Sequence, residues 1–317
     1  MARKKGKLQI WVEYLVARAI IGGIGLLPRS LAIGLGVFVA NLGYLLLGNL
    51  RKTGMRNLEI AFPENSREEN ERILKASFKN LGRVLGETSQ FPKYSKEKLA
   101  SMIEFEFESD EIKDLPEYDK TQAERAKGRG VILAGPHLGN WEMGVYAYSA
   151  MQEPINYLAR PIDNPLIQQM TVDLRTKFGN RPINKTNGVI EAIDILRAGG
   201  VVGVLPDVNM HPKEGVFVPF FGVSACTTAG VAMLAIRTNA MIIPMCCVWD
   251  EKKQKYFVPV HRNVIEPART GDRHEDVLQT TAAMTRAMEE FIRAYPEQWL
   301  WIHKRWKSRP PGEKSLY

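Results

Sequence analysis

Short apolar runs alternate with segments of helical periodicity along the second half of the chain, and this alternation limits the possible folds more than any other feature. Strands are expected at 130–134, 154–158, 201–205 and 241–249, and helices at 165–178, 189–198, 228–238 and 274–295. A further run, 255–261, has the pattern of the antiparallel return of a hairpin. Because alternating strands and helices build layered folds, the sequence predicts an α/β fold with a mixed central sheet covered by helices on both faces.

The region before this alternation supplies further expected elements. An apolar stripe that includes Ile73, Phe78 and Leu85 predicts a helix over 64–88. Apolar and acidic residues alternate over 102–108, which indicates a half-buried strand. The polar segment 114–127 is expected to be a surface connection or an exposed helix.

Two apolar stretches, 8–27 and 31–47, lie near the N-terminus. Basic residues flank them on both sides: Arg3, Lys4, Lys5 and Lys7 before, and Arg51, Lys52 and Arg56 after. No small-x-small cleavage site stands at the right place, so we expect no removed signal peptide. The pattern predicts a membrane-anchoring helical segment over 1–50, followed by a larger domain over 51–317. The segment is expected to form a shallow hairpin on the cytoplasmic leaflet or one crossing plus an interfacial helix; a buried core hairpin is the alternative.

A formal net charge of +8 predicts an anionic partner, either nucleic acid or anionic lipid. The C-terminal segment 299–307 interleaves Trp with Lys and Arg, which suits base stacking, a belt at the lipid headgroups, or a packed C-terminal strand. The apolar N-terminus favours a membrane surface, and we expect no nucleic-acid partner. The three cysteines, Cys226, Cys246 and Cys247, form no disulfide framework and are expected to be reduced, facing the cytoplasm.

His137 and Glu142 are the strongest candidate catalytic pair. Gly135 and Pro136 end an apolar run, so His137 is expected on the turn after a strand and Glu142 on the first turn of the next helix. From there Glu142 can reach back to the imidazole, and a histidine oriented by a carboxylate can act as a general base. No nucleophilic side chain stands beside the pair, so the nucleophile is expected to arrive with the substrate. A histidine that merely caps the sheet is the alternative.

Gly139 and Asn140 lie between these two residues, at the expected start of the helix. Small and polar residues there leave backbone N–H groups open, and such groups can hold an oxyanion or a phosphate. Ordinary N-capping by Asn140 is compatible with that role. The chain has neither a His-Glu-x-x-His pattern nor a cysteine pair with ligand spacing, so we expect no metal.

Further candidates lie at the ends of later strands, where ligands of open α/β sheets bind. Pro161 keeps Arg160 extended, so Arg160 is expected to meet a phosphate beside His137, or else to form a surface salt bridge. Asp207 is expected on the same rim, where it can bind a hydroxyl or stabilise a cation, or else form an Asx turn. Its neighbours Val208 and Asn209 are included as candidate substrate-binding residues.

The aromatic segment 215–222 suits a loop that lines an acyl-chain pocket, although core packing would explain it equally well. Cys226 follows shortly afterwards. We do not expect it to be a nucleophile, because no histidine or cation has a visible reason to lower its pKa.

Six blocks of this sequence, in order, resemble the bacterial lipid A late acyltransferases, within the lysophospholipid acyltransferase superfamily. They are Arg56-Asn57-Leu58 with Phe62-Pro63, His137-x4-Glu142, 157–165 around Arg160, Pro206-Asp207, 217–222 with Thr227-Thr228, and 296–301 running into Arg305-Trp306-Lys307. One block would be weak, but six in order are specific, and the resemblance runs from about Arg51 to Gly312. A basic N-terminal membrane anchor also belongs to the family's pattern.

The resemblance implies an enzyme on the cytoplasmic face of the bacterial inner membrane. It would transfer an acyl chain from acyl carrier protein, or from a CoA thioester, to a hydroxyl of an anionic lipid A precursor, with no other cofactor. His137 would take the hydroxyl's proton and Glu142 would hold the imidazole, without an acyl-enzyme. The resemblance also implies that Gly139 and Asn140 N–H groups face the oxyanion, that Arg160 binds the acceptor's phosphate and that Asp207 shapes the acceptor pocket.

Two positions inside the motif depart from the lipid A pattern. Leu138 and Asn140 stand where many lipid A members have Phe and His, and the Asp207 segment lacks a second acidic residue. The Gly-Asn-Trp sequence is similar instead to mycobacterial-type mannoside acyltransferases, which have Asp at the position of Glu142. Acyl transfer to a mannoside glycolipid or a lysophospholipid is therefore the alternative, and a non-enzymatic basic membrane-binding protein is a more distant one.

Overall fold

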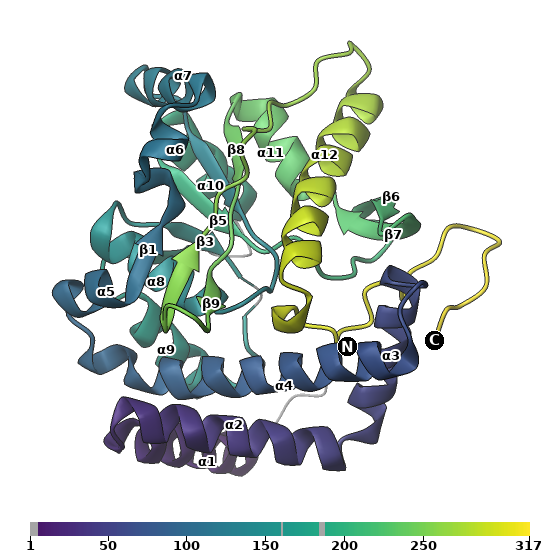
Figure 1. The fold of residues 1–317 in the computed structure, drawn as a ribbon. Helices are drawn as coiled ribbons and strands as arrows, with labels where there is room; N and C mark the ends of the chain where they lie inside the picture. The colour runs from purple at the N-terminus through teal and green to yellow at the C-terminus, as the bar shows by residue number, and fades with distance from the viewer. Residues whose placement is uncertain (1–5, 160, 184–187) are drawn as a thin grey trace.

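A five-stranded parallel sheet forms the centre of the molecule. The computed structural model describes residues 6–159, 161–183 and 188–317 (Figure 1). The strands are β2 (Val131–Ala134), β3 (Asn156–Leu158), β4 (Arg181–Ile183), β5 (Val201–Val204) and β8 (Met241–Pro244), in the order β4-β3-β5-β2-β8. All four pairings are parallel, so the carboxyl ends of the strands meet at one edge.

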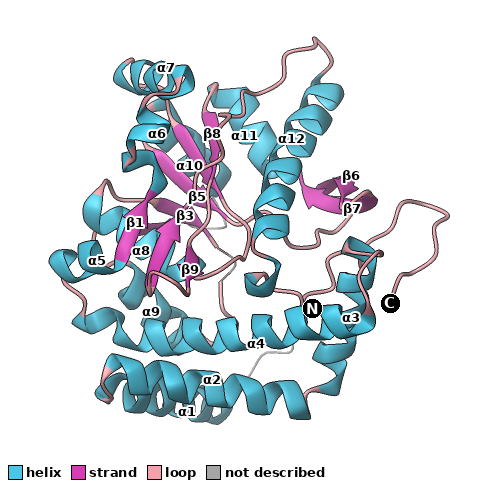
Figure 2. Cartoon of the chain, viewed as in Figure 1, coloured by secondary structure: helices cyan, strands magenta, loops and turns pink. Residues whose placement is uncertain are grey.

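Helices cover both faces of this sheet, as the sequence predicts (Figure 2). Ile132 and Val202 belong to one apolar cluster with α10 (Gly188–Arg197), α11 (Gly230–Thr238) and α12 (Arg273–Ala294). Their neighbours Val131 and Val201 pack in a separate cluster that includes residues of α8 (Trp141–Met151). Successive side chains of a strand point to opposite faces, so short runs that are apolar throughout supply both clusters.

The sequence predicts a mixed central sheet, but the five central strands described pair in parallel, and antiparallel pairing within the described residues occurs in two small sheets and in isolated bridges, one of them from Ile242 of β8 to Ile265. β9 (Val248–Asp250) and β10 (Lys255–Val258) form the expected hairpin, and β10 also pairs in parallel with β1 (Ile103–Phe105). The apolar run 241–249 is therefore two strands in two sheets. β6 (Gly215–Phe220) and β7 (Val223–Thr228) form a hairpin, where the sequence predicts a loop over 215–222 and a helix from residue 228.

The remaining elements connect these layers. They are η1 (Phe91–Lys93), α5 (Lys96–Met102), η2 (Glu106–Glu108), α6 (Asp110–Lys113), α7 (Pro116–Ala126), α9 (Pro165–Arg175) and η3 (Pro296–Gln298). Asn164 caps α9 by accepting hydrogen bonds from two backbone N–H groups of its first turn. Pro165 takes the first helical position, where its missing N–H costs nothing.

The N-terminal region is a set of four helices. They are α1 (Lys7–Leu26), α2 (Arg29–Leu46), α3 (Gly48–Ala61) and α4 (Arg67–Gln90), and Figure 1 shows α1 and α2 running alongside α4. α1 and α2 are long and apolar enough to cross a membrane, by length and composition. The basic residues Arg3, Lys4 and Lys5 lie outside the described residues, and the domain boundary at residue 50 stays a prediction.

α2 and α4 pack backbone against backbone. A Cβ atom added to Gly36 of α2 would lie 2.2 Å from the carbonyl oxygen of Gly82 of α4, and one added to Gly82 would lie 2.5 Å from the Gly36 oxygen. Only glycine permits an approach this close. At the start of α2, Arg29 pairs with Glu87 of α4, whose side chain is fully buried. These contacts join the apolar N-terminal helices to the rest of the chain.

The C-terminal tryptophans lie in the core. Trp299, Trp301 and Trp306 are at most 3% exposed and pack against Phe220 and Phe221 at the tip of the β6–β7 hairpin. These three side chains are thus packed in the core, although the segment 299–307 forms no strand, and both the base-stacking and the headgroup-belt interpretations are wrong for them.

We expect Gly36→Ala to destabilise the protein and Gly34→Ala to leave it as stable or slightly more so. The added methyl at residue 36 forces α2 away from α4, at a cost of about 1–3 kcal/mol. A Cβ on Gly34, on the same helix, has no neighbour within 4 Å, so only the gain in helix propensity of up to about 1 kcal/mol remains. Thermal unfolding in detergent, followed by tryptophan fluorescence, measures both variants. Equal effects of the two substitutions would contradict the close packing.

Candidate active site

His137 and Asp207 meet at the carboxyl edge of the central sheet. His137 lies on the turn after β2, and Asp207 follows β5, the neighbouring strand. His137 Nδ1 is 2.6 Å from Asp207 Oδ1, and the His137 backbone N–H donates to Oδ2 at 2.7 Å. The indole N–H of Trp299 donates to the same Oδ2 at 2.8 Å. The carboxylate is 2% exposed and thus fully engaged by these donors.

This contact determines which nitrogen of His137 is available for chemistry. With Nδ1–H held by Asp207, the neutral imidazole carries its lone pair on Nε2. The His137 side chain is 21% exposed, whereas that of Asp207 is buried. The pair therefore has the arrangement of a general base and its orienting carboxylate.

Burial and the Asp207 carboxylate act on His137 in opposite directions. Burial lowers the pKa of His137, but the charge of Asp207 and its hydrogen bond outweigh this, and the pKa lies above its ordinary value of 6.5. For Asp207, burial acts to raise the pKa, while the charge and hydrogen bonds of His137 and Trp299 lower it, with a net shift downward. The two partners therefore stabilise each other's charged forms.

Glu142 does not orient His137, so this part of the prediction is wrong. Its carboxylate pairs with Arg175 at the end of α9, with Arg175 Nε donating to Oε2 at 2.7 Å and a second, shorter contact beside it. Glu142 still raises the pKa of His137 through its charge, and Arg175 lowers it. The sequence alone does not point to Arg175, because it lies 33 residues beyond Glu142 and has no local motif around it.

The backbone N–H groups proposed for the oxyanion are already engaged, so that prediction is also wrong. Gly139 N–H donates to the Gln298 carbonyl at 3.0 Å, and Asn140 N–H donates to the Cys247 carbonyl at 2.7 Å. Gly139 has φ of +64°, and an added Cβ would lie 1.9 Å from the Cys247 oxygen. The Gly139-Asn140 sequence is therefore required by the conformation of the turn that carries His137.

Asn140 instead caps the helix that follows the turn. Its side-chain oxygen accepts from the Met143 N–H at 3.0 Å, as the capping interpretation expects. From α4, the side-chain amide of Asn80 donates to the Gly139 carbonyl at 2.8 Å. The turn that carries His137 is thus held by the C-terminal segment, by Cys247 just before β9 and by α4.

Asn209 fastens the loop after Asp207 to the C-terminal segment. Its backbone N–H donates to His303 Nε2 at 2.9 Å, and its side-chain oxygen accepts from the Ser308 N–H at 2.9 Å. Burial lowers the pKa of His303, in keeping with its role as an acceptor. Val208 is half-buried in the same loop. Substrate binding by Val208 and Asn209 stays a prediction, and Arg160 lies outside the described residues.

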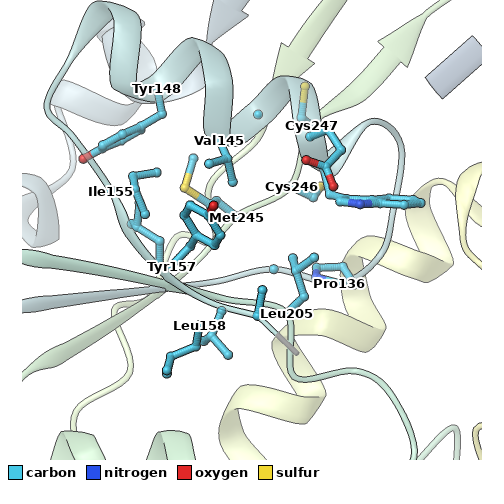
Figure 3. A pocket seen from close by; sticks show the side chains of 18 of the residues that line it. Pro136, Val145, Tyr148, Ile155, Tyr157, Leu158, Leu205, Met245, Cys246 and Cys247 are labelled. Atoms are coloured by element: carbon cyan, nitrogen blue, oxygen red, sulfur yellow. The ribbon is translucent and has the colours of Figure 1, made fainter. Parts of the chain in front are cut away.

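An apolar cavity of about 110 Å³ lies between α8 and the sheet, next to the turn that carries His137. Figure 3 shows Pro136 and Leu205 at one end of it and Tyr148 and Ile155 at the other. Glu142 and Arg175 also line it. The segment 215–222 does not line this cavity. Phe220 and Phe221 are instead buried with Trp299, Trp301 and Trp306, so of the two predicted roles core packing is the correct one for them.

The cysteines show no sign of nucleophilic chemistry. All three are buried. Burial raises the pKa of Cys246 and of Cys247, and it also raises that of Cys226. Thiols with raised pKa values are poor nucleophiles at neutral pH, in agreement with the expectation for Cys226.

Comparison with known proteins gives a consistent family. The model of the bacterial lipid A biosynthesis acyltransferases matches residues 2–308. The chain is 30% identical to a lipid A biosynthesis lauroyltransferase of Escherichia coli, over 92% of this chain and 90% of the relative. It is 28% identical to the palmitoleoyltransferase of the same organism, over 98% and 92%. A lipid A biosynthesis acyltransferase of Haemophilus influenzae is 26% identical over 84% and 78%.

We expect Asp207→Asn to lower the pKa of His137 from above to below 6.5. The substitution removes the raising effect of the carboxylate and leaves the lowering effect of burial. Histidine-selective NMR, with the His137 signal assigned from His137→Gln, measures the titration. Glu142→Gln serves as the control and is expected to lower this pKa by a smaller amount. A larger shift in the control than in Asp207→Asn would contradict the assignment of the dyad.

Proposed function

Because the chain belongs to the bacterial lipid A biosynthesis acyltransferase family and is therefore an acyltransferase, we propose that it transfers a fatty acyl chain from an acyl thioester to a hydroxyl of a lipid A precursor. The observation that carries the mechanism is the His137–Asp207 dyad beside an apolar cavity. The buried thiols offer no protein nucleophile, which favours direct transfer between the two substrates.

In the proposed reaction, His137 Nε2 takes the proton of the acceptor hydroxyl as that oxygen attacks the thioester carbonyl carbon. Asp207 stabilises the imidazolium that forms. The tetrahedral intermediate then collapses, the carbon–sulfur bond breaks, and the imidazolium returns its proton to the departing thiolate. The products are an ester and a free thiol, and the dyad is back in its starting state.

The apolar cavity is proposed to hold the acyl chain. Its walls come from alternate residues of the strands and from one face of α8, including Leu133, Val145 and Met245. An acyl chain buried there leaves its carbonyl at the carboxyl edge, where His137 lies. The Glu142–Arg175 pair joins α8 to α9 along the side of the cavity and is proposed to keep this channel in shape.

The N-terminal helices are proposed to bring the enzyme to the cytoplasmic face of the inner membrane. Large apolar side chains of α1 and α2 are exposed: Leu8, Trp11, Val12, Leu15, Val16, Ile20, Leu26, Leu31, Leu35, Phe38, Val39, Leu42, Leu45 and Leu46. An exposed apolar surface of this extent marks a membrane or partner contact. We further propose acyl carrier protein as the donor's carrier, phosphate binding by Arg160, and no cofactor beyond the thioester.

We expect His137→Gln to reduce acyl transfer by roughly 10²–10⁴-fold, the range for loss of a general base. Purified protein, an acyl thioester and a lipid A precursor are incubated in mixed micelles, and mass spectrometry follows the gain of one acyl chain. His274→Gln, at an exposed position on α12, is the matched control and should keep full activity. Full activity in His137→Gln would rule out the mechanism, and acylation of a lysophospholipid or mannoside alone would rule out the acceptor.

The rate should also depend on pH in a way that the dyad determines. The base must be neutral, so kcat/KM is expected to fall as the pH drops through the pKa of His137, with a midpoint above 6.5. In Asp207→Asn this midpoint moves to lower pH while the rate at neutral pH falls. Steady-state rates between pH 5 and pH 9 provide the measurement. An unchanged midpoint in the variant would show that another group sets the profile.

A further inference from the structure

A second cavity, of about 310 Å³, lies beyond the first one. The central sheet contributes apolar side chains, among them Val131, Val201 and Ile243, and further lining residues come from η2, α6, α7, α8 and the segment 260–264. Val131 and Val201 are buried, whereas polar residues such as Gln122 and Arg262 are exposed. The cavity therefore has an apolar floor on the sheet and a polar opening to solvent. The mechanism described above does not use it.

The two cavities are consecutive parts of one groove between α8 and the sheet. Along β2, Gly135 and Leu133 line the first cavity, and Leu133 and Val131 line the second. Because strand residues two apart share a face, both cavities lie on the same face of the sheet.

The residues of α8 line the two cavities in the same order along the helix. Glu142, Val145 and Tyr148 of α8 line the first cavity, and Tyr148 and Gln152 line the second. Residues three and four apart share one face of a helix, so the groove continues along α8. At 1.5 Å per residue, the second cavity adds about 6 Å to the roughly 9 Å between Glu142 and Tyr148.

Three side chains line both cavities and so form the wall between them: Leu133, Tyr148 and Met245. Leu133 is buried in the sheet. Tyr148 packs edge-on against Phe105 and Phe107, and burial, with the nearby Glu153, raises its pKa to about 12, so its ring stays neutral. Met245 is unbranched, and unbranched thioether side chains adapt most readily to a changed space. Met245 is therefore the adjustable part of this wall.

We propose that Met245 ends the acyl pocket and thereby sets the length of chain that the enzyme transfers, with the second cavity as the site for the terminal methylenes of longer chains. The proposal rests on the proposed function, which places the acyl chain in the first cavity. The two Escherichia coli relatives are named for acyl chains of different length, lauroyl and palmitoleoyl. The ion pair of Arg125 with Glu153, at 2.6 Å, lies at the far side of the second cavity and limits the apolar space there.

The test makes the side chain at residue 245, in the wall between the cavities, smaller in one variant and larger in another. Met245→Ala joins the cavities and should shift the ratio of rates for longer over shorter saturated acyl thioesters by about tenfold or more, the range for added methylenes in an apolar pocket. Met245→Trp should shift the same ratio toward shorter chains. Ile243, two residues earlier on β8, lines only the second cavity. By itself, Ile243→Phe should leave the preferred acyl-chain length unchanged. Combined with Met245→Ala, it should cancel the shift toward longer chains.

Displacement of a fluorescent fatty acid by saturated fatty acids of graded length, measured on the full-length variants, provides a second readout that needs no acceptor. Thermal unfolding confirms that each variant is folded. Unchanged length profiles in folded Met245→Ala and Met245→Trp would overturn the proposal even if transfer to the lipid A precursor is observed. If length-dependent binding shifts as expected while no transfer to the precursor occurs, the pocket assignment stands and the proposed acceptor fails.

Discussion

The buried carboxylate of Asp207 is the constraint on which the site depends. A carboxylate removed from water is costly unless donors surround it, and this one receives three hydrogen bonds from two distant parts of the chain. His137 lies 70 residues before Asp207, and Trp299 lies 92 residues after it. Satisfying the charge therefore fixes the turn after β2, the end of β5 and the C-terminal segment relative to one another. The same contacts choose the tautomer of His137, so the fold and the chemistry share one interaction.

Much of the fold follows from the periodicity of the sequence, because an apolar run flanked by helical segments has few ways to be buried. The helices at α4, α9, α10 and α12 lie close to where the patterns predict them. The β6–β7 hairpin was not predicted, since its aromatic residues look like a loop until Trp299 and Trp306 are known to cover them. The sequence also does not show the direction of strand pairing. The apolar run 241–249 looks like one strand, but it forms β8 and β9, which belong to two different sheets.

The sequence predicts which residues belong to the candidate site better than it predicts the contacts between them. Parallel strands share a carboxyl edge, so placing His137 and Asp207 on one rim needed only the strand assignments. Their pairing needed the order of the strands, which puts β5 next to β2. Glu142 is the nearest carboxylate after His137 in the sequence, but it pairs with Arg175 on another helix. The Gly139 N–H is likewise engaged by a carbonyl almost 160 residues away, which no local pattern reveals.

The close contact of Gly36 with Gly82 bears on how such an enzyme meets its lipid. α4 touches α2 through this pair and donates from Asn80 to the carbonyl of Gly139, two residues from His137. One continuous helix thus contacts both the apolar N-terminal helices and the turn that carries His137. If α1 and α2 sit in the bilayer as proposed, the height of the imidazole above the membrane is a fixed dimension of the molecule. The enzyme would then acylate only a hydroxyl that lies at the height of the imidazole above the membrane. Acceptor choice would therefore depend on the height of the headgroup hydroxyl as well as on headgroup chemistry.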